Sequence, residues 1–309
     1  MNFIKGFTFK FVLDSQNFYS DEVVKSSIEL LKESTAINTI VFAIQALQDH
    51  PHAERIDYNG QQMPTDEQLI EYVQYAQHLG LKVILKPMLD CRNGTWRAHI
   101  NFFDIDVPCE PKWKNWFKSY TDYLLHYAKL AEKTKCEMLM IGCELVQTER
   151  KEIYWRSLIE KIRGEYSGLL TYNTDKYQEG EVKWWDALDV ISSSGYYPIN
   201  EWEENLKRIE RVVECYQKPF FFAECGCPSR TGAANIPNDW TLEGSLNLEE
   251  QSDYYSKMFE ICETKSWING FVCWEWTSNI TEETRVDDGY NVYRKPACGV
   301  IKKYYRAKA

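Results

Sequence analysis

Two glutamates in this sequence each follow an apolar run of the kind that forms a buried strand. Glu144 ends the run MLMIGCE, and Glu224 ends the run FFFAE. A pair of carboxyls that face one another suits glycoside hydrolysis, which needs a protonated carboxyl on the leaving oxygen and an ionised one beneath the anomeric carbon. Two carboxyls held that close cannot both ionise easily, so the pKa of one rises and the pair divides into an acid and a nucleophile.

Aromatic and polar side chains follow other apolar runs in the same way. Sugar rings have flat C–H faces that stack on aromatic rings, while their hydroxyls need polar partners. A single such residue is more often part of the packing than of a binding site, so the prediction depends on their convergence at one place. The predicted sugar-binding residues are Lys86, Asp90, Asn93 and Trp96 in LKPMLDCRNGTW, Asn173 in TYNTD, Tyr196 and Tyr197 in ISSSGYYP, and Trp274 and Trp276 in GFVCWEWTS.

The elements that must position these residues alternate along the whole chain. Most of the short apolar runs are continuous, as expected for parallel strands buried on both faces. Amphipathic segments with helical spacing separate them, and only a short helix fits between residues 176 and 188. The predicted strands are Phe3–Phe9, Thr39–Ile44, Lys82–Pro87, Met138–Cys143, Leu169–Asn173, Val190–Ser194, Phe220–Ala223 and Gly270–Trp274.

Eight strands that alternate with helices most simply close into a (β/α)8 TIM barrel. An open doubly wound sheet is the alternative, but the first turn between strand and helix lacks the GxGxxG fingerprint. We therefore predict a single α/β domain over residues 1–309. Active sites of such barrels lie at the carboxyl ends of the strands, and strands four and seven, which carry the glutamates, lie across the barrel mouth from each other.

The composition argues against several classes of partner. The chain has 309 residues and a formal net charge of −10, from 36 Lys and Arg against 46 Asp and Glu. Nucleic acids and anionic membranes select for clustered basic residues, so neither is an expected partner. No apolar stretch reaches the length of a spanning helix, and the amino-terminal stretch lacks the apolar block of a signal peptide. We expect a cytoplasmic location.

Other chemistries have weaker support. His50 and His52 have a spacing found in metal sites, but they lie in a polar loop with few further ligands available. Cys225 and Cys227 beside Glu224 are better explained by a tight turn with small side chains, and reduced thiols are expected for the ten cysteines. There is no phosphate-binding glycine loop and no GxSxG elbow. No metal and no cofactor is therefore expected.

Together, the motifs KPMLDCRNGTWR, MIGCE, GYYP, FFFAECG and CWEW resemble glycoside hydrolase family 113, the β-1,4-mannanases of the clan A retaining glycoside hydrolases. The resemblance extends from the first predicted strand to the eighth. It implies a retaining double displacement with Glu144 as acid/base and Glu224 as nucleophile, without a metal. It also implies β-mannan or manno-oligosaccharides as the substrate.

One position departs from the wider clan. Most clan A enzymes have Asn directly before the acid/base glutamate, where it binds the sugar 2-hydroxyl, but here that position is Cys143. A contact with the 2-hydroxyl strengthens in the transition state, and a thiol is a poor donor. An axial 2-hydroxyl, as in mannose, must then be held by another residue, with Asn93, Asn173 and Tyr196 as candidates.

Three alternatives remain open at this point. The chain could be an exo-acting β-mannosidase or another β-glycosidase on the same barrel. It could be a sugar-binding barrel without catalysis, although such a protein has no need for two glutamates at strand ends. A metal-dependent sugar isomerase on this fold would need several histidines and carboxylates at the strand ends, and only the glutamates are present.

Overall fold

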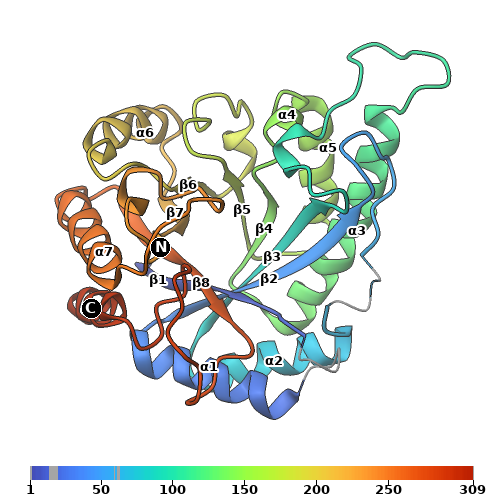
Figure 1. Cartoon of the computed structure of the whole chain (residues 1–309). Coiled ribbons are helices and arrows are strands. Elements are labelled where there is room, and N and C mark those ends of the chain that lie inside the picture. Colours follow the sequence, from blue (N-terminus) through green and yellow to red (C-terminus); the bar gives the residue numbers. More distant parts are fainter. Residues whose placement is uncertain (1, 14–19, 59, 61–62, 309) are drawn as a thin grey trace.

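Eight parallel strands close into a barrel within the part of the chain that the computed structural model describes, residues 2–13, 20–58, 60 and 63–308 (Figure 1). Each strand pairs with the next one along the chain, and the last pairs with the first. The predicted (β/α)8 barrel is confirmed. The strands are β1 Ile4–Lys10, β2 Thr39–Gln48, β3 Lys82–Cys91, β4 Met138–Cys143, β5 Leu169–Thr174, β6 Val190–Gly195, β7 Phe220–Cys225 and β8 Ile268–Thr277.

Helices surround the strands on the outside of the barrel, as Figure 1 shows. Thr65 and Gln68 form a capping box at the start of the second helix, with both hydrogen bonds at 3.2 Å. The helices are α1 Asp21–Thr35, α2 Asp66–His78, α3 Trp113–Thr134, α4 Val146–Glu149, α5 Glu152–Arg163, α6 Trp202–Tyr216, α7 Leu248–Glu263 and α8 Pro296–Ala307, with short 3-10 turns η1 Arg97–His99, η2 Trp185–Ala187 and η3 Ala233–Asn235.

The strands bury side chains on both faces, which explains their continuous apolar runs. One face packs under the helices in a large cluster that includes Phe42, Leu85 and Phe222. The opposite face forms a separate cluster inside the barrel, where Ile84 and Phe221 come from neighbouring positions of the same strands. Successive residues of a strand point to opposite faces, so a parallel barrel needs apolar residues at both.

Several strands are longer than predicted, and all of them extend at the carboxyl end. β2 and β3 stay paired as far as Gln48 and Cys91, beyond the polar residues Gln45 and Asp90. These polar residues interrupt the apolar pattern without ending the strand, because their side chains lie at the mouth of the barrel. Backbone pairing therefore continues to the residues that form the site.

The segment between β4 and β5 forms two helices. α4 ends at Glu149, and α5 runs from Glu152 to Arg163. The carboxyl of Glu149 is buried, where it accepts hydrogen bonds from Tyr172 at 2.8 Å and Thr174 at 2.9 Å. Glu149 is therefore anchored to β5 and does not lie on the outer face of α5.

The connection between β5 and β6 contains only the 3-10 turn η2, consistent with the short helix predicted there. Two buried tryptophans fill the place of the missing helix. Trp184 stacks on Trp155 of α5 with ring centroids 4.6 Å apart and donates from its indole to the Glu149 carbonyl at 3.0 Å. Trp185 donates to the Glu179 carbonyl at 2.8 Å. Aromatic packing thus closes this side of the barrel.

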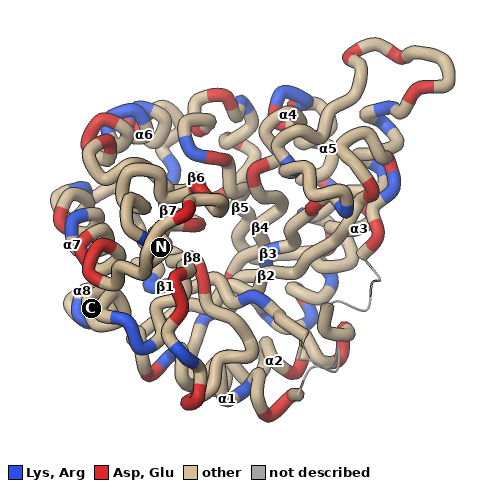
Figure 2. Tube along the Cα trace, viewed as in Figure 1, with Lys and Arg blue, Asp and Glu red and all other residues tan. Residues whose placement is uncertain are grey.

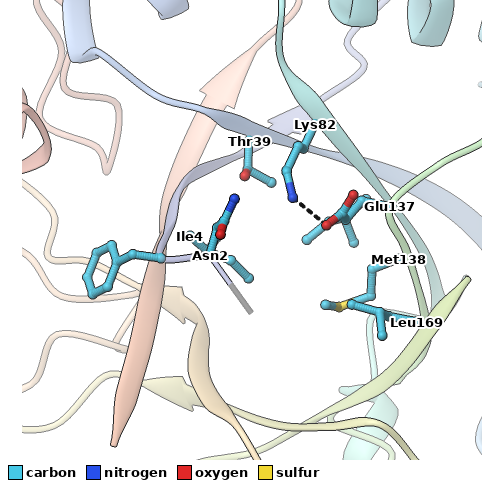
Figure 3. Close-up of a pocket in the computed structure, with 9 residues that line it drawn as sticks. Asn2, Ile4, Thr39, Lys82, Glu137, Met138 and Leu169 are labelled. Atoms are coloured by element: carbon cyan, nitrogen blue, oxygen red, sulfur yellow. Dashed lines mark hydrogen bonds and ion pairs between the residues drawn. The ribbon is translucent and has the colours of Figure 1, made fainter. Parts of the chain in front are cut away.

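A small pocket lies at the amino-terminal end of the barrel, lined by side chains from β1 to β5 and the residues before them (Figure 3). Lys82 and Glu137 form an ion pair there, beside Met138 and Leu169. Figure 2 shows Lys and Arg interspersed with Asp and Glu along the outer helices. None of the described helices combines the length and apolar character needed to cross a membrane.

We predict that Trp184→Ala destabilises the fold, because it empties a fully buried site and removes the stacking on Trp155. Loss of a buried tryptophan costs about 3–5 kcal/mol in the free energy of unfolding. Urea denaturation followed by circular dichroism measures it. Ile153→Ala is the matched control, since Ile153 lies on α5 with 84% of its side chain exposed. Equal midpoints for the two variants would contradict the packing role of Trp184.

Candidate active site

Both glutamates follow an irregularity in the strand that carries them. Between β4 and β5 the pairing passes from Met140↔Thr171 to Cys143↔Asn173, so β4 uses three residues where β5 uses two. Between β6 and β7 it passes from Ser193↔Phe222 to Ser194↔Glu224, so β7 has one extra residue. An extra residue bends a strand and redirects the next side chain. The irregularities therefore turn both carboxyls into the barrel mouth.

The backbone at Glu144 leaves the strand in the left-handed region, with φ of 52°. Its N–H still donates to the Asn173 carbonyl at 2.8 Å. The N–H of the next residue, Leu145, donates to the Tyr172 hydroxyl at 2.9 Å, and that hydroxyl donates to the Glu149 carboxyl at 2.8 Å. A non-glycine residue in this conformation persists only where its surroundings hold it. Two backbone hydrogen bonds to β5 hold Glu144.

The Glu224 carboxyl is buried among cationic and polar donors. Lys86, which is fully buried, forms an ion pair with Oε1. The Tyr196 hydroxyl donates to Oε2 at 2.9 Å. Burial by itself raises the pKa of Glu224, but the charge and hydrogen bond of Lys86, with Arg97 and Tyr196, lower this pKa below its usual value. Glu224 is thus held in the ionised form.

The Glu144 carboxyl has a different environment. The Ser194 hydroxyl donates to Oε1 at 2.7 Å, and Arg97 lies 3.3 Å from Oε2. Burial and the negative charge of Glu224 raise the pKa of Glu144, and this effect exceeds that of the Arg97 charge. The two glutamates therefore have pKa values shifted in opposite directions. Such a pair supplies a proton donor and an ionised carboxylate at the same pH.

Cys143 lies beside both carboxyl environments. Its Sγ is 3.4 Å from Glu224 Oε1 and 3.6 Å from Arg97 Nη1. Burial raises the pKa of this thiol well above its usual value, so it is neutral. A neutral thiol adds no charge to a site that already holds two carboxyls and two cations.

An open cleft lies over the pair of carboxyls. Its walls come from the loops after β3, β5 and β7 and from the ends of β3, β6 and β8. Trp274 and Trp240 meet edge to face there, with ring centroids 6.1 Å apart, and 55% of Trp240 is exposed. The lining includes Glu144 and Glu224 with Met88, Asp90, Trp96, Arg97, Asp175, Lys176, Tyr196, Asn238, Trp240, Thr241 and Trp274.

Three of the five predicted aromatic residues line the cleft. Trp274 and Tyr196 line the cleft, and so does Trp96, which is 45% exposed. Tyr197 does not, because neighbouring residues point to opposite faces, and its hydroxyl donates to Glu179 at 2.7 Å. The structure therefore places Tyr197 outside the cleft, contrary to the position predicted for it.

Trp276 is also placed differently from the prediction. Its spacing from Trp274 suggested the same face, but β8 has an extra residue between Cys273 and Trp276 relative to β1. This irregularity turns Trp276 outward, where it is fully buried and its indole donates to Ser27 at 3.0 Å. Trp276 therefore also lies outside the cleft, contrary to the position predicted for it.

The predicted polar residues fall into three groups. Asp90 lines the cleft, but Asn93 is exposed in the following turn, where its side chain accepts from the Thr95 N–H at 3.1 Å. Lys86 and Asn173 are fully buried beneath the carboxyls and bond to each other at 2.9 Å. The two N–H groups of Asn173 donate to the Thr174 carbonyl and to Ser194, both at 2.9 Å. Neither of these N–H groups is available to a sugar hydroxyl. Lys86 and Asn173 therefore lie beneath the two carboxyls and position them, and do not line the cleft.

Four residues of the site were not predicted. Arg97 stands in the quoted motif KPMLDCRNGTWR, and Ser194 stands directly before GYYP, but neither has a spacing that marks it. Asp175 follows β5, and burial with the charge of Glu144 raises its pKa to about 7. Trp240 lies in the long loop after β7, whose course no local pattern determines.

No group of three or more His, Cys, Asp or Glu side chains within the described residues is arranged to hold a metal. His50 and His52 have exposed side chains in the loop after β2. All ten cysteines are free thiols in the structure. The arrangement in the cleft is that of acid–base and nucleophilic chemistry by two carboxyls, on a substrate that presents rings and hydroxyls.

Comparisons with known proteins agree with this geometry. The family model described as Glycoside Hydrolase Family 113 matches residues 7–295. A solved structure described as a complex of a GH113 β-1,4-mannanase is 56% identical, with a TM-score of 0.96, over 99% of this chain and 100% of that one. The GH113 β-mannanase of Alicyclobacillus acidocaldarius is 38% identical, with a TM-score of 0.94, over 100% of this chain and 99% of that one.

A more distant match shares the fold alone. The β-glucuronidase of Ruminococcus gnavus is 16% identical, with a TM-score of 0.65, over 98% of this chain and 50% of that one. A comparison with curated protein sequences found no match. The fold and the site define a barrel hydrolase of the retaining clan A type. The chain belongs to glycoside hydrolase family 113.

We predict that Glu149→Gln flattens the dependence of stability on pH. Burial raises the pKa of Glu149 to about 8, against 4.5 for an ordinary glutamate. The folded state therefore holds a proton that the unfolded state has lost, and the stability due to neutral Glu149 is lost as pH rises from about 4.5 to about 8. Glutamine keeps the acceptor for Tyr172 and does not titrate.

Urea midpoints at pH 5 and pH 8 measure this effect. The variant should lose less stability than the wild type between the two values. Glu152→Gln is the matched control, because Glu152 begins α5 with 43% of its side chain exposed and should follow the wild type. An equal change of the urea midpoint between pH 5 and pH 8 in all three proteins would contradict the assignment of a neutral Glu149.

Proposed function

We propose that this chain is a retaining β-1,4-mannanase in which Glu224 is the nucleophile and Glu144 the acid/base. The observation that carries the proposal is the opposite electrostatic environment of two buried carboxyls in one cleft. Lys86 and Tyr196 favour the ionised form of Glu224, while burial and the charge of Glu224 favour the neutral form of Glu144. A retaining glycosidase needs these two forms in its resting state.

In the first step a Glu224 oxygen attacks the anomeric carbon, and the bond from that carbon to the glycosidic oxygen breaks. The leaving oxygen takes the proton of Glu144. A covalent ester between the sugar and Glu224 results, and Glu144 becomes a carboxylate. Tyr196 donates to the Glu224 oxygen that does not pair with Lys86, which fixes the carboxylate in the plane needed for attack.

In the second step water attacks the same carbon from the side that the leaving sugar has vacated. A water proton passes to Glu144, the new C–O bond forms, and the ester bond breaks with its electron pair returning to Glu224. Both carboxyls regain their starting forms. Two inversions at one carbon give net retention of configuration.

The substrate assignment is supported by the family and by the cleft. The two most similar structures named above are described as β-1,4-mannanase and β-mannanase. Trp274 provides an apolar surface beside the carboxyls, and Trp96 and Trp240 lie further along the cleft. Aromatic surfaces of this kind suit a chain of linked sugar rings. We infer that β-mannan or manno-oligosaccharides occupy the cleft.

Product analysis with β-1,4-mannohexaose, cellohexaose and xylohexaose tests the substrate. We expect cleavage of the mannose oligomer with products of two or more sugars, and little or no cleavage of the other two. Release of single mannose units would instead support an exo-acting β-mannosidase. Cleavage of cellohexaose at a comparable rate, or of none of the three, would contradict the mannanase assignment.

Replacing each glutamate separates their roles. Glu224→Gln removes the nucleophile and should lower turnover by at least about 10³-fold on every substrate, because no ester can form. Glu144→Gln should retain more activity on an aryl mannoside with a dinitrophenolate leaving group, which needs no proton donor, than on an oligosaccharide. The assignment is tested by the ratio of the rate on the aryl mannoside to the rate on the oligosaccharide, compared between each variant and the wild type. The reverse pattern would exchange the roles.

We further predict that Lys86→Gln moves the acidic limb of the pH–rate profile to higher pH. Without the Lys86 charge the pKa of Glu224 rises, so the ionised nucleophile is lost at a higher pH as the solution is acidified. Rates of aryl mannoside hydrolysis from pH 4 to pH 8 measure the shift. Lys82→Gln is the matched control on the same strand, since Lys82 pairs with Glu137 at the opposite end of the barrel. An unchanged acidic limb would contradict the role of Lys86.

A further inference from the structure

Arg97 is the cation that contacts the Glu144 carboxyl, and its side chain is fixed on several sides. Its Nη1 lies 3.3 Å from Glu144 Oε2 and 3.6 Å from the Cys143 sulfur. Its Nη2 and Nε donate to Asp90 Oδ1 at 2.6 and 3.0 Å, and Nε also donates to the Leu89 carbonyl at 2.9 Å. With 11% of the side chain exposed, the guanidinium has a single orientation that aims one edge at Glu144.

Asp90 is itself held from the neighbouring strand. Gln45 of β2 donates to Asp90 Oδ2 at 2.6 Å, while Oδ1 receives Arg97. β2 and β3 are paired through this region. The position of the Arg97 guanidinium therefore comes from the barrel and not from the loop in which Arg97 lies. A fixed charge is more effective at a reacting group than one that must reorganise.

The charged groups that face Glu144 come from β3, β5 and β7 or the loops after them. Arg97 and Lys86 are cationic, and Glu224 and Asp175 are acidic. Ser194 of β6 and the thiol of Cys143 are neutral. In the resting state the charge of Glu224 offsets the cations, and Glu144 keeps its proton.

Formation of the ester changes this balance. Glu224 loses its negative charge when it bonds to the sugar, so the group that most opposed ionisation of Glu144, apart from burial, is gone. The Arg97 charge remains 3.3 Å from Oε2. In the first step the effect of Arg97 on the pKa of Glu144 is smaller than the combined effect of burial and Glu224. In the second step Arg97 is the strongest charged neighbour of Glu144.

We propose that Arg97 is a positioning residue for the second step of the reaction, in which it holds Glu144 as an oriented carboxylate ready to accept a proton from water. The proposal rests on the roles of Glu144 and Glu224 proposed above. Arg97 exchanges no proton and forms no bond. Water attacks the anomeric carbon, its proton passes to Glu144, and the bond to Glu224 breaks with the electron pair remaining on Glu224.

The test uses Arg97→Gln and a β-mannobioside with a dinitrophenolate leaving group. The first step needs no acid with this substrate, so slowing of the second step makes the ester accumulate. We expect kcat to fall on the order of 10- to 100-fold, which is part of what a general base contributes. KM should fall by a similar factor, leaving kcat/KM within about 3-fold of the wild type. A burst of dinitrophenolate should precede the steady state.

Azide gives a second readout that a merely structural role would not move. Azide attacks the anomeric carbon of the ester, a C–N bond forms, and the bond to Glu224 breaks without any proton transfer. Azide should therefore raise kcat of Arg97→Gln at least about 5-fold and yield the β-mannobiosyl azide, while the wild type changes little. Arg97→Lys keeps the charge and should recover part of kcat.

The pH profile and a control variant complete the design. Without the Arg97 charge the pKa of Glu144 rises further, so the alkaline limb of kcat/KM for mannohexaose should move to higher pH. Arg92→Gln is the control in the same loop, because Arg92 pairs with Asp49 and Asp57 away from the cleft lining. Its kinetics should match the wild type.

Two outcomes would overturn the proposal. In the first, kcat and kcat/KM of Arg97→Gln fall together without a burst and azide has no effect, which would reduce Arg97 to a structural support. In the second, Arg97→Gln behaves as Arg92→Gln does. Failure of the proposed function is distinguishable, because the wild type itself would then not cleave β-mannosides, or Glu224→Gln would keep its activity.

Discussion

The buried ion pair between Lys86 and Glu224 is the interaction on which the rest of the site depends. Both groups leave water almost completely, which is costly for each charge alone. The cost is offset only when every polar atom finds a partner. Lys86 therefore also donates to Asn173, and Glu224 also accepts from Tyr196. Removal of either ion would leave the other as an uncompensated buried charge.

This pair links the chemistry to the architecture of the barrel. Lys86 comes from β3, Asn173 from β5, Tyr196 from the end of β6 and Glu224 from β7. Only a closed barrel brings side chains from strands so far apart in sequence into one polar layer. Below this layer lies the apolar cluster that includes Ile84 and Phe221. The ion pair is therefore bounded by apolar side chains on the inside of the barrel, and Glu224 faces the cleft on the other side. A low-dielectric floor strengthens each electrostatic contact above it.

The sequence was sufficient to predict the barrel, the positions of its strands and the two glutamates. These features depend on local patterns, namely continuous apolar runs and the residue that follows each run. The sequence did not predict the side-chain directions of Tyr197 and Trp276, which both point away from the cleft. An extra residue in β8 turns the side chain of Trp276 to the opposite face of the sheet, and no local sequence pattern predicts such a bulge.

A different reason explains why other residues of the site were not predicted from the sequence. Arg97 and Ser194 are polar residues whose importance lies in what they contact, and those contacts join residues 47 and 50 positions apart. Asn93 and Asn173 were equally plausible sugar-binding residues from their types. In the structure Asn93 accepts a hydrogen bond within a turn, and Asn173 donates both N–H groups to other residues of the protein. Residue type and neighbourhood identify a candidate, whereas hydrogen-bond satisfaction decides its availability, and that property belongs to the folded structure.

The charges of the site form an alternating series that explains why a thiol suits position 143. Lys86, Glu224, Arg97 and Asp90 alternate in sign, and both Glu224 and the neighbouring Glu144 change charge during the reaction proposed here. Cys143 contacts Glu224 on one side and Arg97 on the other. A strong donor there would compete with Lys86 for Glu224 Oε1, whereas the neutral thiol is only a weak donor to that oxygen, at 3.4 Å. Cys143 therefore lies between two charged pairs, Lys86 with Glu224 and Arg97 with Asp90.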